Sequence, residues 1–551
     1  MSETETAPAA TAVDGGDVTG DEDKALPTET DGHPGDGGQT RDNAETSAEL
    51  GADLSTGSDR GRDRRAATWW LAAGVVGAFL ITHAVAIYQS LGPATIAAND
   101  VRLYAWWVQM GHDSGVWPGI QEDFVYPVGA LVPMLLASVF GTVEVTYLAT
   151  WCLMVAAINA LTSWVVIRRF GLIQSAGPLT GWFVFLMLLG PCGLTRLDAV
   201  MMPLVMIALA VVSARPALAS VLLTSAAWLK VSGGLILAPL FAVAKTWRAR
   251  LLSVVVPAAA TCLAVAIGQH SLGGQWRFWT SFVGAETDRG LQVEAVLATP
   301  VVLAHAFRGE TIPQWNDELS TWETWGPGAE VAIQVSDIAM PLMVLAIAVL
   351  AWLARRRPAE ALTVASLALM SGLIVTHKVG SPQFVAWIAP PLVIGLCQGY
   401  RLRFWTLLSA TGVLAAALTG LLYPWGYGPF LSGDRLWLTI WVVRNLLVVA
   451  IFVAATVKLV RLRPHKSADS VGAEPPGEPP PSAVTDQIQG ADIIRTPSAP
   501  GDRPIGRRDP WMISPTDTHT GCSGTTPIAA SSPPSLNGLH SPGRRTRPPR
   551  R

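Results

Sequence analysis

Two aspartates in separate polar segments are the first candidates for chemistry in this sequence. Asp100 stands in "NDVRLYAWW" (residues 99–107), directly after the first long apolar run, and Asp198 stands in "GLTRLDAV" (residues 193–200). Two such carboxylates suit a general base and a residue that positions it or binds a hydroxyl. Taken alone, Asp100 is also explained as a solvated residue at the outer end of a membrane span. The surrounding segments predict no metal site, because they hold no Asp-X-Asp motif, histidine pair or cysteine cluster.

The composition places these carboxylates in a membrane protein. Half of the 551 residues are hydrophobic and only 15% are charged, and the mean hydropathy is +0.36. A soluble enzyme of this length needs more charge to cover its surface, so most of the chain is predicted to lie in a bilayer. The five cysteines are scattered, which predicts neither a disulfide framework nor a metal cluster.

Two polar tails flank the apolar region. Residues 1–58 carry an acidic balance and are rich in Gly, Thr and Asp, and the predicted tail extends to residue 66. Residues 464–551 are rich in Pro, Ser and Arg. Neither tail holds enough apolar residues to offset the entropy of ordering, so both are expected to be disordered. The first apolar run begins near Trp69, too far from Met1 for a cleavable signal peptide, and is expected to be a retained span. A membrane domain is therefore predicted over residues 67–463.

Twelve membrane spans are predicted, because this count places every basic cluster and both termini in the cytoplasm. A span needs about 20 apolar residues. Residues 217–244 are split into two spans because Lys230 and Pro239 interrupt them and a single crossing would place Lys245–Arg250 outside; one tilted span is the alternative. The predicted spans cover residues 67–88, 143–167, 176–192, 199–213, 217–229, 233–244, 251–268, 338–354, 359–376, 384–398, 404–422 and 435–459.

This topology gathers the aromatic-rich polar segments on the outer face. The two largest are residues 89–142 and 269–337, and the second carries five tryptophans, which settle at headgroup level. Within the first, Val128–Phe140 is too short to cross and is expected to form a helix on the outer leaflet. The predicted fold class is thus an all-α polytopic membrane protein with two large extracytoplasmic loops and an outward-facing site.

The order of five motifs resembles a known family. Together they are similar to the GT-C glycosyltransferases, and in finer detail to the polyprenyl-phosphate-mannose-dependent mannosyltransferases of the actinobacterial glycosyltransferase 87 type. The resemblance covers the membrane core, from about residue 70 to 460, and not the tails. The motifs are "NDVRLYAWW" (99–107), "EDFVYPVGALVPMLLASVFG" (122–141), "WLKVSGGLILAPL" (228–240), "DRGLQVEAVLATP" (288–300) and "HKVGSPQFVAWIAPPL" (377–392).

The resemblance implies a GT-C-like bundle in which Asp100 matches the catalytic aspartate of the first outer loop. Such a base takes the proton from an acceptor hydroxyl, which attacks the anomeric carbon with inversion. The residues expected to bind the acceptor or position the base are Asp198, Glu294 and Tyr126. Ala295 departs from the family pattern, which has a polar residue there.

The outward cations are the residues expected to bind the phosphate of a lipid-linked donor. They are His377, Lys378, Lys230 and Arg289. Plainer interpretations stand beside these roles: Lys230 would snorkel to the interface, His377 and Lys378 would anchor their loop, and Arg289 would pair with Glu294. Tyr126 would simply fill its loop.

No metal or other cofactor is expected, because a monophosphate leaving group carries less charge than a pyrophosphate and basic side chains can serve it. The implied partners are a polyprenyl-phosphate sugar donor, a glycolipid or polysaccharide acceptor of the cell envelope, and membrane lipids, with no nucleic acid. The implied location is the cell membrane, with the active face extracytoplasmic.

A transporter or lipid flippase is the main alternative, because twelve spans with both termini inside are also a common transporter layout. The nearly charge-free span interiors, the polar outer rim and the lack of an internal repeat favour an enzyme. A scaffold protein would explain neither the aromatic outer loops nor the clustered outward Asp, Lys and His. Within the enzyme class an arabinosyltransferase stays open, because nothing in the chain reads the stereochemistry of a hydroxyl.

Overall fold

The computed structural model describes residues 40–92, 95–287, 289–310, 312–316 and 321–463. Most of the predicted tails lies outside these residues, and α1 (Thr40–Leu91) continues the first predicted span back to Thr40. The chain divides into two compact units, Met1–Gly74 and Val75–Arg551. The bundle and the candidate site described below belong to the second unit.

Eight helices of the described residues are long and apolar enough to cross a membrane. Each coincides with one of the predicted spans, which confirms an all-α membrane protein in outline. They are α1, α4 (Glu144–Phe170), α5 (Leu172–Leu189) with η3 (Gly190–Gly193), α10 (Trp247–Arg250) with η4 (Leu251–Val255) and α11 (Val256–Ser271), α14 (Pro327–Leu353), α15 (Pro358–Thr376), α17 (Leu402–Gly420) with η8 (Leu421–Trp425), and α19 (Arg435–Arg461).

The other four predicted spans fall on shorter apolar helices, so the count of twelve crossings stays a prediction. Short helices are tolerated in a membrane where neighbouring protein shields their ends. The core of the bundle offers such shielding, since α15 is buried from Glu360 to Ile374. The short helices are α6 (Asp198–Val211), α7 (Pro216–Leu229), α8 (Val231–Gly234) with α9 (Leu237–Val243), and η7 (Pro382–Ile388) with α16 (Ala389–Gln398).

Residues 217–244 form a helical hairpin that turns at Lys230. Lys230 has an extended backbone conformation between α7 and α8. A Cβ on Gly234 would contact Ala227, so the chain folds back closely on the end of α7. At the other end, Pro216 and Val243 line the same small cavity. α7 and the α8–α9 segment are therefore antiparallel, as the split into two segments predicts.

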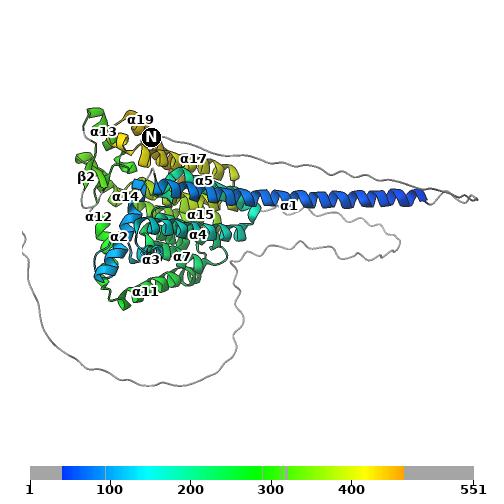
Figure 1. Cartoon of the computed structure of the whole chain (residues 1–551), viewed down its shortest axis with the longest axis horizontal. Coiled ribbons are helices and arrows are strands. Elements are labelled where there is room, and N and C mark those ends of the chain that lie inside the picture. The colour runs from blue at the N-terminus through cyan, green and yellow to red at the C-terminus, as the bar shows by residue number, and fades with distance from the viewer. Residues whose placement is uncertain (1–39, 93–94, 288, 311, 317–320, 464–551) are drawn as a thin grey trace, which may run out of the picture. The chain divides into compact units, whose positions relative to one another are not determined.

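The basic clusters and the polar aromatic segments occupy opposite ends of the bundle. Figure 1 shows α2 (Asn99–Ser114), α12 (Ser281–Thr287), α13 (Thr299–Arg308) and β2 (Gln314–Asn316) at one end. At the other end, the start of α7, Lys245 after α9 and the start of α15 line one cavity. This sorting is the one expected from the charges, while the membrane face that each end occupies stays a prediction.

The helix predicted on the membrane surface is present in residues 128–140, the segment too short to cross the membrane. η2 (Val128–Ala130) and α3 (Leu131–Ala137) cover most of it. Its buried side includes Leu131 and Met134, whereas Val132 and Leu136 are 58% and 60% exposed. One apolar face therefore packs on the protein and a second apolar face stays uncovered, which suits contact with lipid.

A small antiparallel sheet corrects the expectation of a purely helical protein. Its strand order is β1 (Leu291–Gln292), β3 (Thr321–Thr324), β2 (Gln314–Asn316), with Trp315 opposite Trp322. The strands have two to four residues each, too few to show the alternation that marks a strand in a sequence. The sheet belongs to a second apolar core that includes Leu291, Phe430 and Trp441.

The loop after α15 docks on β1. The backbone N–H of Gln292 donates to the Lys378 carbonyl at 3.0 Å, and the Gly380 N–H donates to Oε1 of Gln292 at 3.1 Å. A Cβ on Gly380 would collide with backbone atoms of Glu294 and Ala295. Ala295 is fully buried in this contact, which explains why a polar residue is absent there.

Gly380→Ala should therefore destabilise the protein by about 3 kcal/mol, the upper part of the range for overpacking. The obstacle is backbone, which cannot rotate away as a side chain can. Thermal unfolding of detergent-purified protein measures the effect. Gly428→Ala is the matched control, because a Cβ on Gly428 meets no atom within 4 Å. Equal melting temperatures for the two variants would show that the loop is not held in this contact.

Candidate active site

Asp100 lies in the first turn of α2 and forms an ion pair with a buried arginine. Its Oδ2 atom is 2.9 Å from Nε of Arg196, and the two side chains are 31% and 7% exposed. The guanidinium is fixed from behind, because its Nη1 donates to the carbonyls of Ala97 at 2.5 Å and Thr195 at 3.1 Å. The carboxylate is thus held firmly while part of it stays open to solvent.

The charge on Arg196 is maintained despite its burial. Burial lowers the pKa of the Arg196 guanidinium, but Asp100 and the weaker effects of Cys192, Tyr423 and Tyr104 together raise it by more, so the net pKa lies above its ordinary value. An opposite charge in contact favours the charged form in this way. Arg196 therefore stays charged, and its ion pair fixes the orientation of the Asp100 side chain.

Asp198, the first residue of α6, is held from two sides. Nζ of Lys230 lies 3.1 and 3.3 Å from its two carboxylate oxygens, and Nε1 of Trp387 donates to Oδ1 at 2.5 Å. The Lys230 ammonium also lies 4.4 Å from the centre of the Phe384 ring. Asp198 is only 2% exposed, so it is a buried carboxylate.

Two tyrosines connect the two carboxylates. The Leu197 N–H donates to the hydroxyl of the buried Tyr104 at 3.4 Å, and the ring of Tyr126 lies edge-on to Tyr104 with 6.4 Å between centroids. Burial raises the pKa of the Tyr126 phenol, and Asp100 and Asp198 raise it further, whereas Arg289 lowers it. Tyr126 therefore stays protonated within electrostatic reach of both carboxylates.

Glu294 belongs to a second cluster near β1. Its carboxylate accepts a hydrogen bond from the Tyr427 hydroxyl, and Nη1 of Arg444 donates to its backbone carbonyl at 3.3 Å. Burial raises the pKa of the Glu294 carboxyl above its ordinary value of 4.5, although the Tyr427 hydrogen bond and the Arg444 charge lower it. Tyr427 therefore positions the Glu294 carboxyl, the role for which a pair with Arg289 was one expectation.

His377 and Lys378 follow the end of α15 and lie in the loop that docks on β1. Nδ1 of His377 accepts from the Val379 N–H at 2.9 Å, and its ring lies 6.0 Å from that of Phe384. Nζ of Lys378 is 3.4 Å from Oδ1 of Asp337 on α14, with side chains 6% and 57% exposed. Phe384 thus lies between the Lys230 ammonium and the His377 ring.

The two clusters are linked by Tyr423 of η8. Its phenol acts electrostatically on the Arg196 guanidinium, and its ring contacts that of Tyr427 with 5.1 Å between centroids. All the residues expected to act in catalysis or binding therefore gather at one end of the bundle, around the starts of α2 and α6, the Lys230 turn and β1.

Sequence reasoning missed several residues of this site. Trp387 and Tyr427 carry no local signal, because tryptophan and tyrosine are common at membrane interfaces. Arg444 and Asn445 did carry one: they interrupt the apolar run "WVVRNLLVV" (residues 441–449), and both are 2% exposed. An ionisable residue inside a span is by default a functional or structural hypothesis.

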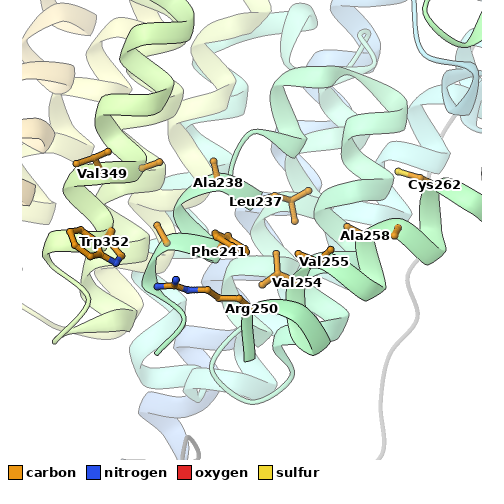
Figure 2. A pocket seen from close by; sticks show the side chains of 13 residues that line it. Leu237, Ala238, Phe241, Arg250, Val254, Val255, Ala258, Cys262, Val349 and Trp352 are labelled. Carbon is orange, nitrogen blue, oxygen red and sulfur yellow. The ribbon is translucent and has the colours of Figure 1, made fainter. Parts of the chain in front are cut away.

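A cavity of about 770 Å³ lies elsewhere in the bundle, between α9, α11 and α14 (Figure 2). Its lining side chains are apolar apart from Arg250, with Phe241 and Trp352 the largest among them. None of the candidate site residues lines it. An apolar cavity offers no hydrogen bonds to sugar hydroxyls, so we do not assign it to a sugar substrate.

The Asp198–Lys230 pair predicts a strongly coupled mutant pair. Asp198→Asn should lower the free energy of unfolding by about 3–5 kcal/mol, because it leaves a largely buried ammonium without its counter-charge. Adding Lys230→Gln should restore part of that stability, since two amides can bond to each other. Thermal unfolding of the single and double variants measures the coupling. Simple addition of the two losses would show that the pair is not a unit.

Glu294 predicts a pH dependence of stability. Because its pKa is raised in the folded protein, the folded state binds this proton more tightly than the unfolded chain does. The stabilisation is complete below pH 4.5 and is lost as the pH rises through the folded pKa. Glu294→Gln removes this titration, so its melting temperature should fall less than that of the wild type as the pH rises above 4.5.

Glu330→Gln provides the control for this measurement, because Glu330 is an exposed carboxylate in the first turn of α14. That variant should follow the wild-type curve. A Glu294→Gln curve parallel to the wild type would mean that the Glu294 carboxyl titrates alike in the folded and unfolded chains.

Comparison with known proteins gives one match. The model of glycosyltransferase family 87 matches residues 124–377. This segment includes six of the eight candidate site residues, namely Tyr126, Asp198, Lys230, Arg289, Glu294 and His377. Asp100 lies before it, and Lys378 follows its last residue. No curated protein and no solved structure matches the chain.

Proposed function

We propose that this chain, whose residues 124–377 match the model of glycosyltransferase family 87, is a membrane glycosyltransferase that transfers a hexose from a polyprenyl phosphate. Mannose is the proposed sugar, and a glycolipid or polysaccharide of the cell envelope is the proposed acceptor. We further propose a GT-C-like bundle of twelve spans over residues 67–463, with cytoplasmic termini and the active site on the extracytoplasmic face. The polar tails would lie in the cytoplasm.

Asp100 is the proposed general base. The observation that carries the proposal is its ion pair with Arg196, which fixes one carboxylate oxygen and leaves the side chain 31% exposed. A base must lie within hydrogen-bond reach of the proton that it takes. The ion pair with Arg196 keeps the Asp100 carboxylate in a fixed position from which it can do so. The start of α2 also follows the first span directly, which fixes its depth near the headgroups.

The reaction would proceed by one displacement. Asp100 takes the proton from an acceptor hydroxyl, whose oxygen forms a bond to the anomeric carbon of the donor sugar. The bond between that carbon and the phosphate oxygen breaks, and its electron pair leaves with the lipid phosphate. Attack opposite to the leaving group inverts the anomeric configuration. The proton then passes from Asp100 to water.

The leaving phosphate needs cations where its charge develops. Lys230 is the best supported of the candidates, because its ammonium lies beside Asp198, two residues from Arg196, and its side chain keeps 18% exposure. Arg289 acts electrostatically on Tyr126 and is proposed as the second. His377 and Lys378 would complete the phosphate site from the loop on β1, with Asp198, Tyr126 and Glu294 on the acceptor side.

An assay of the purified full chain tests this function. Polyprenyl-phosphate mannose is supplied with an extract of membrane glycolipids, and mannosylated product is measured. Polyprenyl-phosphate arabinose in a parallel reaction distinguishes the arabinosyltransferase alternative. Transport of the lipid without product formation would favour a flippase and overturn the proposal.

Asp100→Asn should lower turnover by about 10²–10⁴-fold, because the amide keeps the shape of the side chain but cannot accept the proton. Because Asp100→Asn also leaves the buried Arg196 without its counter-charge, turnover and donor binding are compared per folded molecule. Donor binding should then persist, since the proposed phosphate cations are unchanged. Asp113→Asn is the matched control: Asp113 lies in the same helix and only hydrogen-bonds to Gln109, at 2.8 Å. Near-normal turnover by Asp100→Asn would show that this carboxylate is not the base.

A further inference from the structure

A basic cavity of about 610 Å³ lies at the end of the bundle away from the candidate active site. It is built where three long helices begin or end, so its residues are distant from Asp100 and Glu294 along each helix. Six of its ten lining residues are cations. The lining residues are Arg356, Arg357, Arg401, Phe404, Ala454, Val457, Lys458, Arg461, Leu462 and Arg463.

The cations of this cavity greatly outnumber the nearby carboxylates. Glu360 pairs with the buried Lys458 at 2.6 Å and with Arg357 at 3.7 Å. No other ion pair of a lining cation occurs among residues 40–463 as far as these are described. The cavity therefore has a strong positive charge, which favours a ligand with phosphate groups, because guanidinium groups bind phosphate oxygens bidentately.

The backbone at Arg401 points to a built site. Arg401 has a φ of +48°, and among the described residues it is the one non-glycine with a positive φ. Residues with side chains rarely adopt this conformation, and it persists where the surrounding structure holds it, often at ligand sites.

The remaining lining residues are apolar and narrow the choice of ligand. Phe404, Ala454, Val457 and Leu462 complete the lining of the cavity, and the Lys458 ammonium lies 5.9 Å from the centre of the Phe404 ring. A soluble phosphate compound would leave these apolar residues without a partner. A lipid places a phosphate on the cations and an acyl chain against the apolar residues.

The position of the cavity at the ends of the membrane spans also fits a lipid. Arg356 and Arg357 follow the apolar residues of α14, and Arg461 and Arg463 lie at the end of α19. Cations at the ends of spans lie at headgroup level, where basic pockets between helices bind anionic lipid headgroups. We propose that this cavity is a binding site for an anionic phospholipid, with its phosphate on Arg401 and Arg461 and an acyl chain beside Phe404.

The positive-inside rule explains why cations lie at this end, but not why they converge on one cavity. Arg168 and Arg169 at the end of α4 show the contrast, because both are exposed and line none of the cavities described above. They therefore provide a control with the same change of charge. The proposal does not depend on the catalytic function.

Titration of the full chain with phosphatidylglycerol, followed by native mass spectrometry, tests the site. Phosphatidylcholine is the reference lipid. The wild type and Arg168→Gln/Arg169→Gln should bind phosphatidylglycerol alike and prefer it to phosphatidylcholine. Arg401→Gln/Arg461→Gln should bind it on the order of 30-fold more weakly, from the usual contribution of two cations to anionic lipid binding. If the double variant does not fold, Arg461→Gln alone replaces it in the titration, because Arg461 lies in the regular helix α19.

Three results would overturn the proposal. Equal weakening in both double variants would indicate general attraction to a basic surface. Binding of inorganic pyrophosphate with the same sensitivity to Arg401 and Arg461, and no preference between the two lipids, would indicate a soluble polyanion. No binding of phosphatidylglycerol by the full chain would show that the cavity is not a site for an anionic phospholipid.

Discussion

A buried guanidinium sets the geometry at the candidate active site. Arg196 is almost fully removed from water, so it needs both a counter-charge and hydrogen-bond acceptors in fixed positions. It has Asp100 from α2 and the carbonyls of Ala97 and Thr195. The first turn of α2, the chain before it and the chain before α6 are consequently locked together. The Asp100 side chain is the part of this arrangement that stays open to solvent, with 31% of it exposed.

The neighbouring cations are also paired with carboxylates, which lowers their attraction for an anionic ligand. Lys230 lies against Asp198, and Lys378 lies against Asp337. A phosphate that approaches either lysine shares it with a carboxylate, so its attraction is weaker than to an isolated cation. Moderate attraction would suit the proposed reaction, in which a lipid phosphate is released after each turnover, because a product held too tightly would limit the rate.

Much of the helical framework follows from hydrophobic runs, but the contacts of the site do not. Apolar length and the break at Lys230 sufficed to predict the long helices and the α7–α9 hairpin. The sheet around Trp322 was not predictable, because its strands are held by pairing across a loop rather than by a local pattern. The partners of Asp198 lie 32 and 189 residues away. No local spacing encodes such distances, so the sequence identified the carboxylates but not their partners.

The turn at Lys230 also bears on how the chain enters the membrane. α6 carries Asp198 at its start, and the ammonium that neutralises this carboxylate arrives only after α7 has been made. A buried aspartate without its counter-charge is costly, so α6 cannot pack stably by itself. The three segments α6, α7 and α8–α9 should therefore leave the insertion machinery together, as one cooperative unit. A break in the hairpin would then appear first as failed biogenesis, before any effect on catalysis could be measured.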